Sequence, residues 1–169
     1  MRCRRLIFGL LLATALATPA AAERPAIGFL EGREVAKQIY AGSHGLQSLG
    51  LGLTTKVSDR RARRIVKDLA VGARQKYGLE IRIVSKRARI PGLTSATGDN
   101  PAKWDPAANV IYVRAGMPAR RFLREVGHEY GTFLLARHFG GRERIPGIGE
   151  EPLMFLTHVL DQVIAKDGR

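Results

Sequence analysis

The alternation of apolar and polar positions predicts two long helices with two strands between them. Ile65, Leu69 and Ala73 recur at helical spacing, so the first helix is expected from Ser58 to about residue 77. Ser58 suits the N-cap of this helix, because its hydroxyl can accept from a free backbone N–H, and Gly78 suits its end. The segment is therefore expected to be an amphipathic helix with one buried face.

Two short segments that follow this helix carry the pattern of β-strands. Residues 79–84 alternate apolar and polar side chains, as in a half-buried strand, and residues 109–114 are rich in β-branched and aromatic residues. Residues 85–108 contain repeated proline and glycine turn signals, so we expect mostly loop there, with Trp104 packed against the core.

A second long helix is expected over residues 118–139, since Pro118 suits the first turn and Gly140 the end. Its apolar stripe consists of Phe122, Leu123, Val126, Tyr130, Phe133 and Leu134. At about 100° per residue, Arg124, His128 and Thr132 share a different face, with Glu125 at its edge.

The outer parts of the chain carry weaker patterns. A last helix is expected over residues 150–166, and a short helix over residues 31–40. Residues 42–52 are rich in glycine and serine and are expected to form a loop. The order of all these elements predicts one small α+β domain over residues 58–169, in which a short mixed sheet packs on helices.

Residues 1–22 have the composition of a secretory signal peptide. A basic start with Arg2, Arg4 and Arg5 precedes an apolar run over residues 6–17, and alanines end the segment. A membrane-spanning helix needs about 20 apolar residues, so this run is too short to be an anchor, and we expect no span in the exported chain. The pattern predicts export to the periplasm or the exterior, by the general or the twin-arginine route. Residues 23–57 would then be an N-terminal extension of unassigned structure.

The charge of the chain limits the partners that it favours. The formal net charge is +13, and loss of the three arginines in residues 1–22 would leave +10. Such an excess favours an anionic partner, such as nucleic acid, lipopolysaccharide or an anionic wall polymer. A solvated, arginine-rich surface with no specific partner is the alternative. The only cysteine, Cys3, lies within residues 1–22, so the exported chain is expected to have no disulfide and no thiolate chemistry.

The stretch from Arg124 to His128, with the sequence R-E-V-G-H, carries the candidate chemistry. It differs by one residue from the zinc-protease motif H-E-x-x-H, in which two histidines one helical turn apart bind zinc and the glutamate activates a water molecule. Arg124 stands at the position of the first histidine. A guanidinium stays protonated and only donates hydrogen bonds, so it cannot replace that ligand.

Two neighbouring segments strengthen a resemblance to the zincin metallopeptidases, and to the minimal gluzincins of the ImmA/IrrE type in particular. Residues 105–112, D-P-A-A-N-V-I-Y, are similar to the D-P-x-x-N-x-I-Y strand found in many toxin zincins. Residues 151–156, E-P-L-M-F-L, are similar to the E-A-N-x-F-A pattern that supplies the third zinc ligand at the start of a following helix. The resemblance covers residues 58–166 and implies that an edge strand precedes the motif helix.

Residue by residue, the resemblance implies a role for each matching side chain. Glu125 would be the general base, His128 the second zinc ligand and Glu151 the third ligand, with Glu150 in reserve. An active protein of this kind would hydrolyse peptide or protein substrates with zinc-activated water. Because Arg124 breaks the ligand set, we expect zinc to be absent or weakly bound.

Three interpretations of the broken motif follow. In the first interpretation, His138 or His158 replaces the lost ligand. This replacement is disfavoured, because His138 lies about 15 Å along a continuous helix from His128, and His158 lies about 10.5 Å from Glu151. In the second interpretation, Arg124 forms a salt bridge with Glu150 or Glu151, and its charge replaces that of the metal in a degenerate or atypical metallopeptidase. The third is a cationic periplasmic binding protein that engages an anionic polymer or surface. A chance match on an exposed helix face is the remaining alternative.

Overall fold

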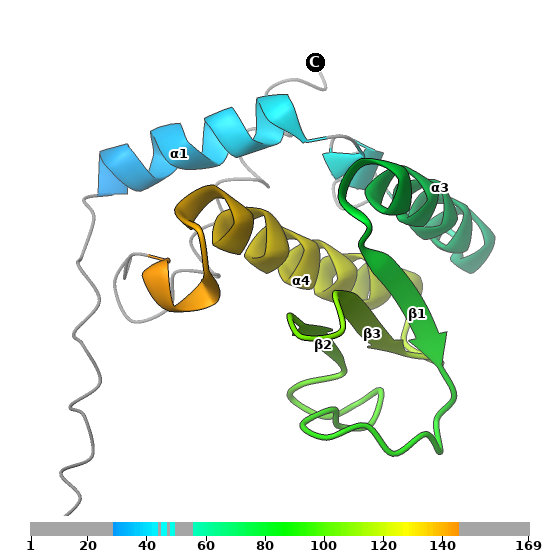
Figure 1. The fold of residues 1–169 in the computed structure, drawn as a ribbon. Helices are drawn as coiled ribbons and strands as arrows, with labels where there is room; N and C mark the ends of the chain where they lie inside the picture. Colours follow the sequence, from blue (N-terminus) through cyan, green and yellow to red (C-terminus); the bar gives the residue numbers. More distant parts are fainter. Residues whose placement is uncertain (1–28, 44, 47, 50–55, 146–169) are drawn as a thin grey trace, which may run out of the picture.

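The computed structural model describes residues 29–43, 45–46, 48–49 and 56–145, and it confirms the α+β class (Figure 1). Helices and a small mixed sheet alternate along this part of the chain. The elements are α1 (Phe29–Gly42), α3 (Asp59–Tyr77), β1 (Glu80–Val84), β2 (Ala102–Asp105), β3 (Val110–Arg114), α4 (Ala119–Phe139) and the short 3-10 helix η1 (Arg142–Arg144).

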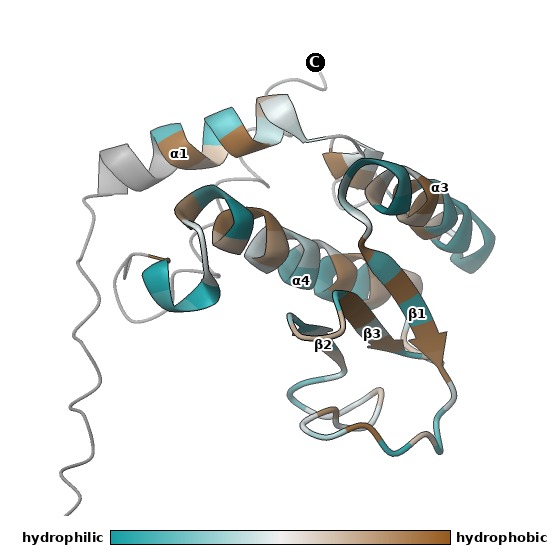
Figure 2. Cartoon of the chain, in the orientation of Figure 1, coloured by the Kyte–Doolittle hydropathy of each residue, from teal (hydrophilic) through white to brown (hydrophobic). Residues whose placement is uncertain are grey.

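The sheet has the strand order β1-β3-β2, with β1 parallel and β2 antiparallel to the central strand β3. Helix α4 runs across the sheet, and α3 lies beside α4 (Figure 1). The core lies between the helices and the sheet, because Ile111 and Val113 of β3 and Leu123 and Val126 of α4 are all fully buried. Figure 2 shows that hydrophilic and hydrophobic residues alternate along β1.

The two long helices form as their sequences predict. The Ser58 hydroxyl accepts from Arg61 N at the start of α3, and Gly78 ends that helix with a left-handed φ of 65°. Gly140 ends α4 in the same way, with a φ of 76°. These caps satisfy backbone groups at helix ends that have no partner within the helix, which is why the ends could be read from local sequence.

Strand β2 corrects the prediction of a loop over residues 85–108. Its four residues, A-K-W-D, are too few to show an alternating pattern, and they become a strand because they pair with β3 from Ala102↔Val113 to Asp105↔Val110. The prediction that Trp104 packs against the core is confirmed, since this side chain is 6% exposed.

The hairpin between β2 and β3 explains why the D-P-A-A-N segment has its sequence. Asp105 Oδ1 accepts from the backbone N–H of Ala107 at 3.0 Å and of Ala108 at 3.2 Å. Asn109 has a φ of 52°, a left-handed conformation that asparagine tolerates better than most residues. The strand directly before α4 is β3, the central strand, so the implication that an edge strand precedes the motif helix is wrong, and the edges are β1 and β2.

Part of the N-terminal extension packs on the same core. Helix α1 is longer than the predicted 31–40 segment, and Ile39 and Tyr40 belong to the same buried cluster as residues of α3 and α4. The prediction of a loop over residues 42–52 is wrong in part, because residues 46, 48 and 49 are helical. Leu46 and Leu49 are buried there, and this burial offsets the weak helix propensity of the glycines around them.

A buried arginine organises the long loop after β1. The side chain of Arg114 donates to the carbonyls of Ser85, Ala88, Leu93 and Thr94, and the residue is only 4% exposed. A buried cation needs compensating hydrogen bonds, and these four carbonyls supply them. Arg114 therefore fixes residues 85–94 at the end of the sheet, although they have no regular secondary structure.

Several predictions lie outside the described residues. These are the signal peptide over residues 1–22 and the C-terminal helix with Glu150, Glu151 and His158. Within the described ranges, no helix is long and apolar enough to cross a membrane.

Candidate functional site

Helix α4 places the R-E-V-G-H residues on the flank of its buried stripe. Leu123, Val126 and Tyr130 are fully buried, so Arg124 faces solvent, while Glu125 and His128 are half-buried between the two environments. The helix continues through Gly131 without a turn, as predicted. His138 consequently lies in the last turn, at the far end of α4 from the motif.

The carboxylate of Glu125 lies between two arginines of its own helix. Arg124 Nη2 lies 3.2 Å from Glu125 Oε1, and Arg121 Nε lies 3.6 Å from the same oxygen. Arg121 also donates to the carbonyl of Gly98, which ties this ion-pair cluster to the loop before β2. The residue expected to be the general base is therefore engaged by two cations.

Glu129 lies one helical turn after Glu125, and sequence reasoning missed it. Its Oε2 accepts from the backbone N–H of Trp104 in β2 at 2.6 Å. That N–H points away from β3, because the backbone hydrogen bonds of this hairpin are formed by the neighbouring residues Lys103 and Asp105. Glu129 therefore satisfies one outward backbone group of the edge strand β2.

A sequence signal for Glu129 was present. His128, Glu129 and Thr132 give H-E-Y-G-T, the same motif spacing shifted by four residues, with threonine at the last ligand position. The Thr132 hydroxyl is engaged within the helix, because it donates to the His128 carbonyl at 2.9 Å. In both registers, a side chain that cannot serve as a ligand replaces one histidine.

An aromatic cluster fixes α4 against β2 beneath these polar groups. The Phe133 ring lies edge-on to Trp104 at 5.6 Å and is stacked with Tyr130 at 6.0 Å. Burial, with a smaller contribution from Tyr77, raises the pKa of the Tyr130 hydroxyl, so it stays protonated at neutral pH. The polar residues of the motif flank therefore lie above a packed, uncharged aromatic cluster.

The donor set of the described residues does not fit zinc. Nowhere in the described ranges do three or more His, Cys, Asp or Glu residues lie close enough to hold a metal ion. His128 is the one imidazole of the motif, and Glu125 and Glu129 are engaged by arginines and by a backbone amide. The guanidinium of Arg124 adds a positive charge, which opposes binding of a divalent cation. Glu150 and Glu151, the other implied ligands, lie outside the described residues.

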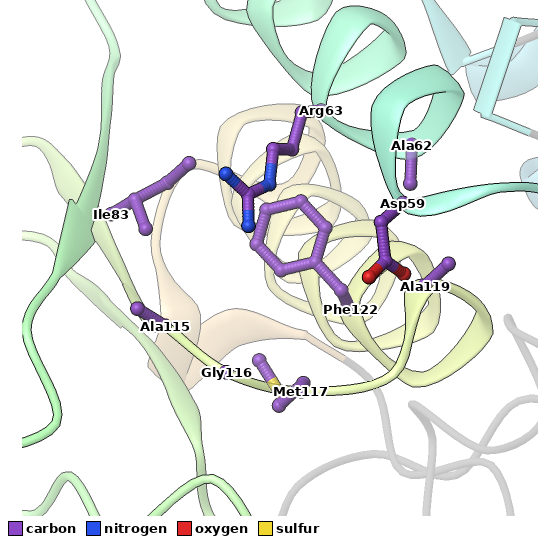
Figure 3. A pocket seen from close by; sticks show the side chains of 9 residues that line it. All are labelled: Asp59, Ala62, Arg63, Ile83, Ala115, Gly116, Met117, Ala119 and Phe122. Carbon is purple, nitrogen blue, oxygen red and sulfur yellow. The ribbon is translucent and has the colours of Figure 1, made fainter.

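A cavity of about 140 Å³ forms a second candidate site, at the ends of α3, β1 and α4 (Figure 3). Its floor is apolar, and two oppositely charged side chains stand at its rim. The lining residues are Asp59, Ala62, Arg63, Ile83, Ala115, Gly116, Met117, Ala119 and Phe122. None of the motif residues lines this cavity, and sequence reasoning did not anticipate it, because its walls come from three segments far apart in the chain.

The molecule thus presents two different candidate sites, one polar and one mainly apolar. The flank of α4 gathers Arg121, Arg124, Glu125, His128 and Glu129 beside β2. The cavity lies near the other edge strand, since Ile83 of β1 lines it. No protein-family profile matches the chain, and neither a curated protein nor a solved structure is significantly similar to it.

Proposed function

We propose that the protein is an exported, zincin-like protein whose motif helix has lost the catalytic zinc site, so that it is a degenerate metallopeptidase. The observation that carries the proposal is the contact of 3.2 Å between the Arg124 guanidinium and Glu125 Oε1. Arg124 occupies the first ligand position, and it pairs with the side chain that would otherwise activate a water molecule.

The arrangement of the elements supports this proposal. The succession of α3, β1, β3 and α4 agrees with the order of elements that the zincin resemblance implies, while β2 is an additional strand, and the D-P-A-A-N-V-I-Y segment forms the hairpin that leads into α4. The motif flank faces the neighbourhood of the edge strand β2, as shown by the contact between Glu129 and Trp104. A substrate-binding surface can persist on such a scaffold after the chemistry is lost.

The remaining groups of the motif favour structural roles over hydrolysis. Glu125 is paired with Arg121 and Arg124, and Glu129 satisfies an amide of the sheet edge. Arg124 is 61% exposed in its side chain, so its pairing with Glu125 contributes little to stability. An engineered change at Arg124 should therefore leave the fold intact and act mainly on metal binding.

The test is the zinc content of the purified full chain, measured by elemental analysis, beside that of Arg124→His. We expect wild type to hold well below one zinc per chain. Arg124→His should bind zinc and gain cleavage of a fluorescent casein substrate, because it restores two histidines one turn apart. Adding Glu125→Gln to that variant should abolish cleavage and keep the zinc.

Arg120→His is the matched control for this experiment. Arg120 is exposed on the same helix, one turn before Arg124, and a histidine there does not complete the motif. It should gain neither zinc nor activity. One zinc per chain in wild type, or an Arg124→His variant with no gain of zinc, would overturn the proposal.

A second candidate function is binding to an anionic polymer, and one face of α3 favours it. Arg60, Arg64, Lys67 and Arg74 are exposed along this helix, and none of them forms an ion pair with a residue in the described ranges. Binding to duplex DNA or lipopolysaccharide that weakens with salt and is unaffected by a chelator would support this function. Restoration of peptidase activity in Arg124→His would support the zincin scaffold instead.

A further inference from the structure

The outer edge of β1 has backbone groups that no described residue satisfies. Glu80 N donates to the Asn109 carbonyl, and Ala115 N donates to the Val84 carbonyl. In a parallel pair, such a pattern directs the groups of alternate residues of β1 toward β3. The N–H and C=O groups of Ile81 and Ile83 therefore point away from the sheet, where they can accept another strand.

The cavity lies at the end of this open edge. β1 runs toward it, and the half-exposed Ile83, with 51% of its surface accessible, is part of its wall. The floor is formed by buried apolar side chains, among them Met117 and Phe122. Its volume of about 140 Å³ is close to the roughly 150 Å³ that holds a benzene-sized molecule. One medium-sized apolar side chain fits it.

The charges at the rim indicate which end of a ligand lies there. In Figure 3 the Arg63 guanidinium reaches between Ile83 and Phe122, on the strand side of the cavity, while the Asp59 carboxylate lies on the far side beside Ala119. Arg63 has no ion-pair partner within the part of the chain that the structure describes. A guanidinium in this position suits a carboxylate that arrives along β1.

The turn after β3 strengthens the positive charge near the cavity. Gly116 has a φ of 90° and lines the cavity, and the end of the flexible Lys86 side chain lies against it. Lys86 is exposed and does not line the cavity, but it lies next to Gly116, so it adds a second cation beside the charged lining residues Arg63 and Asp59. The balance favours an anionic group on the ligand.

We propose that the open edge of β1 and the adjoining cavity bind the extended C-terminal end of another polypeptide. The peptide adds as a strand parallel to β1 and hydrogen bonds to the backbone of Ile81 and Ile83. Its last side chain, of leucine size, fills the cavity, and its terminal carboxylate pairs with Arg63. Strand addition and capture of a C-terminal carboxylate are both established ways of recognising peptides. This site is separate from the α4 flank, so it stands or falls independently of the zincin proposal.

The test uses the full chain and a fluorescein-labelled hexapeptide that alternates valine and threonine and ends in leucine, as the free acid and as the amide. Fluorescence anisotropy should show saturable binding of the acid and about tenfold weaker binding of the amide, because one charge-assisted contact is lost. Arg63→Gln should bring the affinity for the acid to that for the amide. Arg64→Gln, at an exposed neighbour on α3 that does not line the cavity, should leave the affinity unchanged.

Amide hydrogen exchange tests the strand addition itself. Saturating peptide should slow exchange at Ile81 and Ile83 more than at Glu80, whose amide already donates to Asn109. Equal affinity for acid and amide, absence of saturable binding, or an unchanged exchange rate at Ile81 and Ile83 would each overturn the proposal. Protection of both amides before peptide is added would do so too, because a second copy or another part of this chain would then cover the edge.

Discussion

The two edge strands of the sheet, β1 and β2, differ in whether their outward backbone groups have hydrogen-bond partners. At β2, the N–H of Trp104, which points away from β3, donates to Glu129, and the Trp104 ring packs against Phe133. At β1, the outward groups of Ile81 and Ile83 meet no partner from the described segments, and Ile83 is 51% exposed. Helix α4 thus covers the edge at β2 and satisfies one of its outward amides, whereas no described residue does so at β1.

This difference assigns the two regions different roles. An open strand edge can pair with another chain, and proteins usually cover such edges or use them. Two acidic residues of α4 have different partners. Glu129 accepts a hydrogen bond from the backbone of β2, and Glu125 pairs with arginines of its own helix. In our proposals, Glu129 therefore has a structural role, and the peptide-binding site lies at the opposite edge of the sheet.

The largest expected effect is a difference in the free energy of unfolding between a variant at the buried edge strand β2 and one at the exposed edge strand β1. Trp104→Ala should lower the free energy of unfolding by about 3–5 kcal/mol, because it leaves a cavity beneath β2. Ile83→Ala, at a half-exposed position, should cost less than about 1 kcal/mol. Urea denaturation of the two variants measures both values. Similar losses would show that the two edges are equally integrated into the core.

A smaller effect is expected from opening the closed edge. Glu129→Leu should cost about 1–3 kcal/mol, since it leaves the Trp104 N–H without an acceptor. Glu129→Gln keeps an oxygen at this position and should cost less. Amide exchange at Trp104 should accelerate in Glu129→Leu and remain close to wild type in Glu129→Gln. An unchanged rate in the leucine variant would contradict the assignment of Glu129 as the edge cap.

The smallest effect concerns pH and the aromatic base of the closed edge. Burial raises the pKa of Tyr130 in the folded protein above the value of about 10 for an unfolded chain. Well below pH 10 the hydroxyl is protonated in both states, and stability is unaffected. Above it the unfolded chain ionises first, so stability should fall by about 1 kcal/mol at pH 11.

Tyr130→Phe isolates this contribution. The variant should lose less stability than wild type between pH 9 and about pH 11, as measured by urea denaturation at each pH. Tyr112→Phe, at a half-buried position on β3, should keep the wild-type dependence. An identical decline in wild type and Tyr130→Phe would contradict the proposed burial of a neutral hydroxyl.

Local sequence was sufficient for the elements whose determinants are close in the chain. The ends of α3 at Ser58 and Gly78, and the end of α4 at Gly140, were predicted because capping involves residues within one turn. The segments β1 and β3 were predicted because β-branched and alternating residues mark them. The R-E-V-G-H motif was found for the same reason: its spacing is that of a single helix.

The features that were missed depend on residues far apart. The A-K-W-D segment becomes a strand only by pairing with β3, and Glu129 becomes an edge cap only because α4 lies beside Trp104. Arg114 gave no sign in the sequence that its guanidinium would bind the carbonyls of residues 85–94. These contacts join residues 5 to 29 positions apart and depend on how the segments pack, so no periodic pattern within one element records them.

The sequence by itself determined the class of the domain, its two main helices and the R-E-V-G-H spacing on which the zincin proposal rests, because periodicity, caps and motif spacing are short-range properties. The tertiary structure decided which edge of the sheet is closed and which is open, and where the cavity lies. It decided these because backbone groups of a strand are satisfied by whatever segment the fold brings beside them. That segment is α4 for β2, and for β1 we propose the end of another chain.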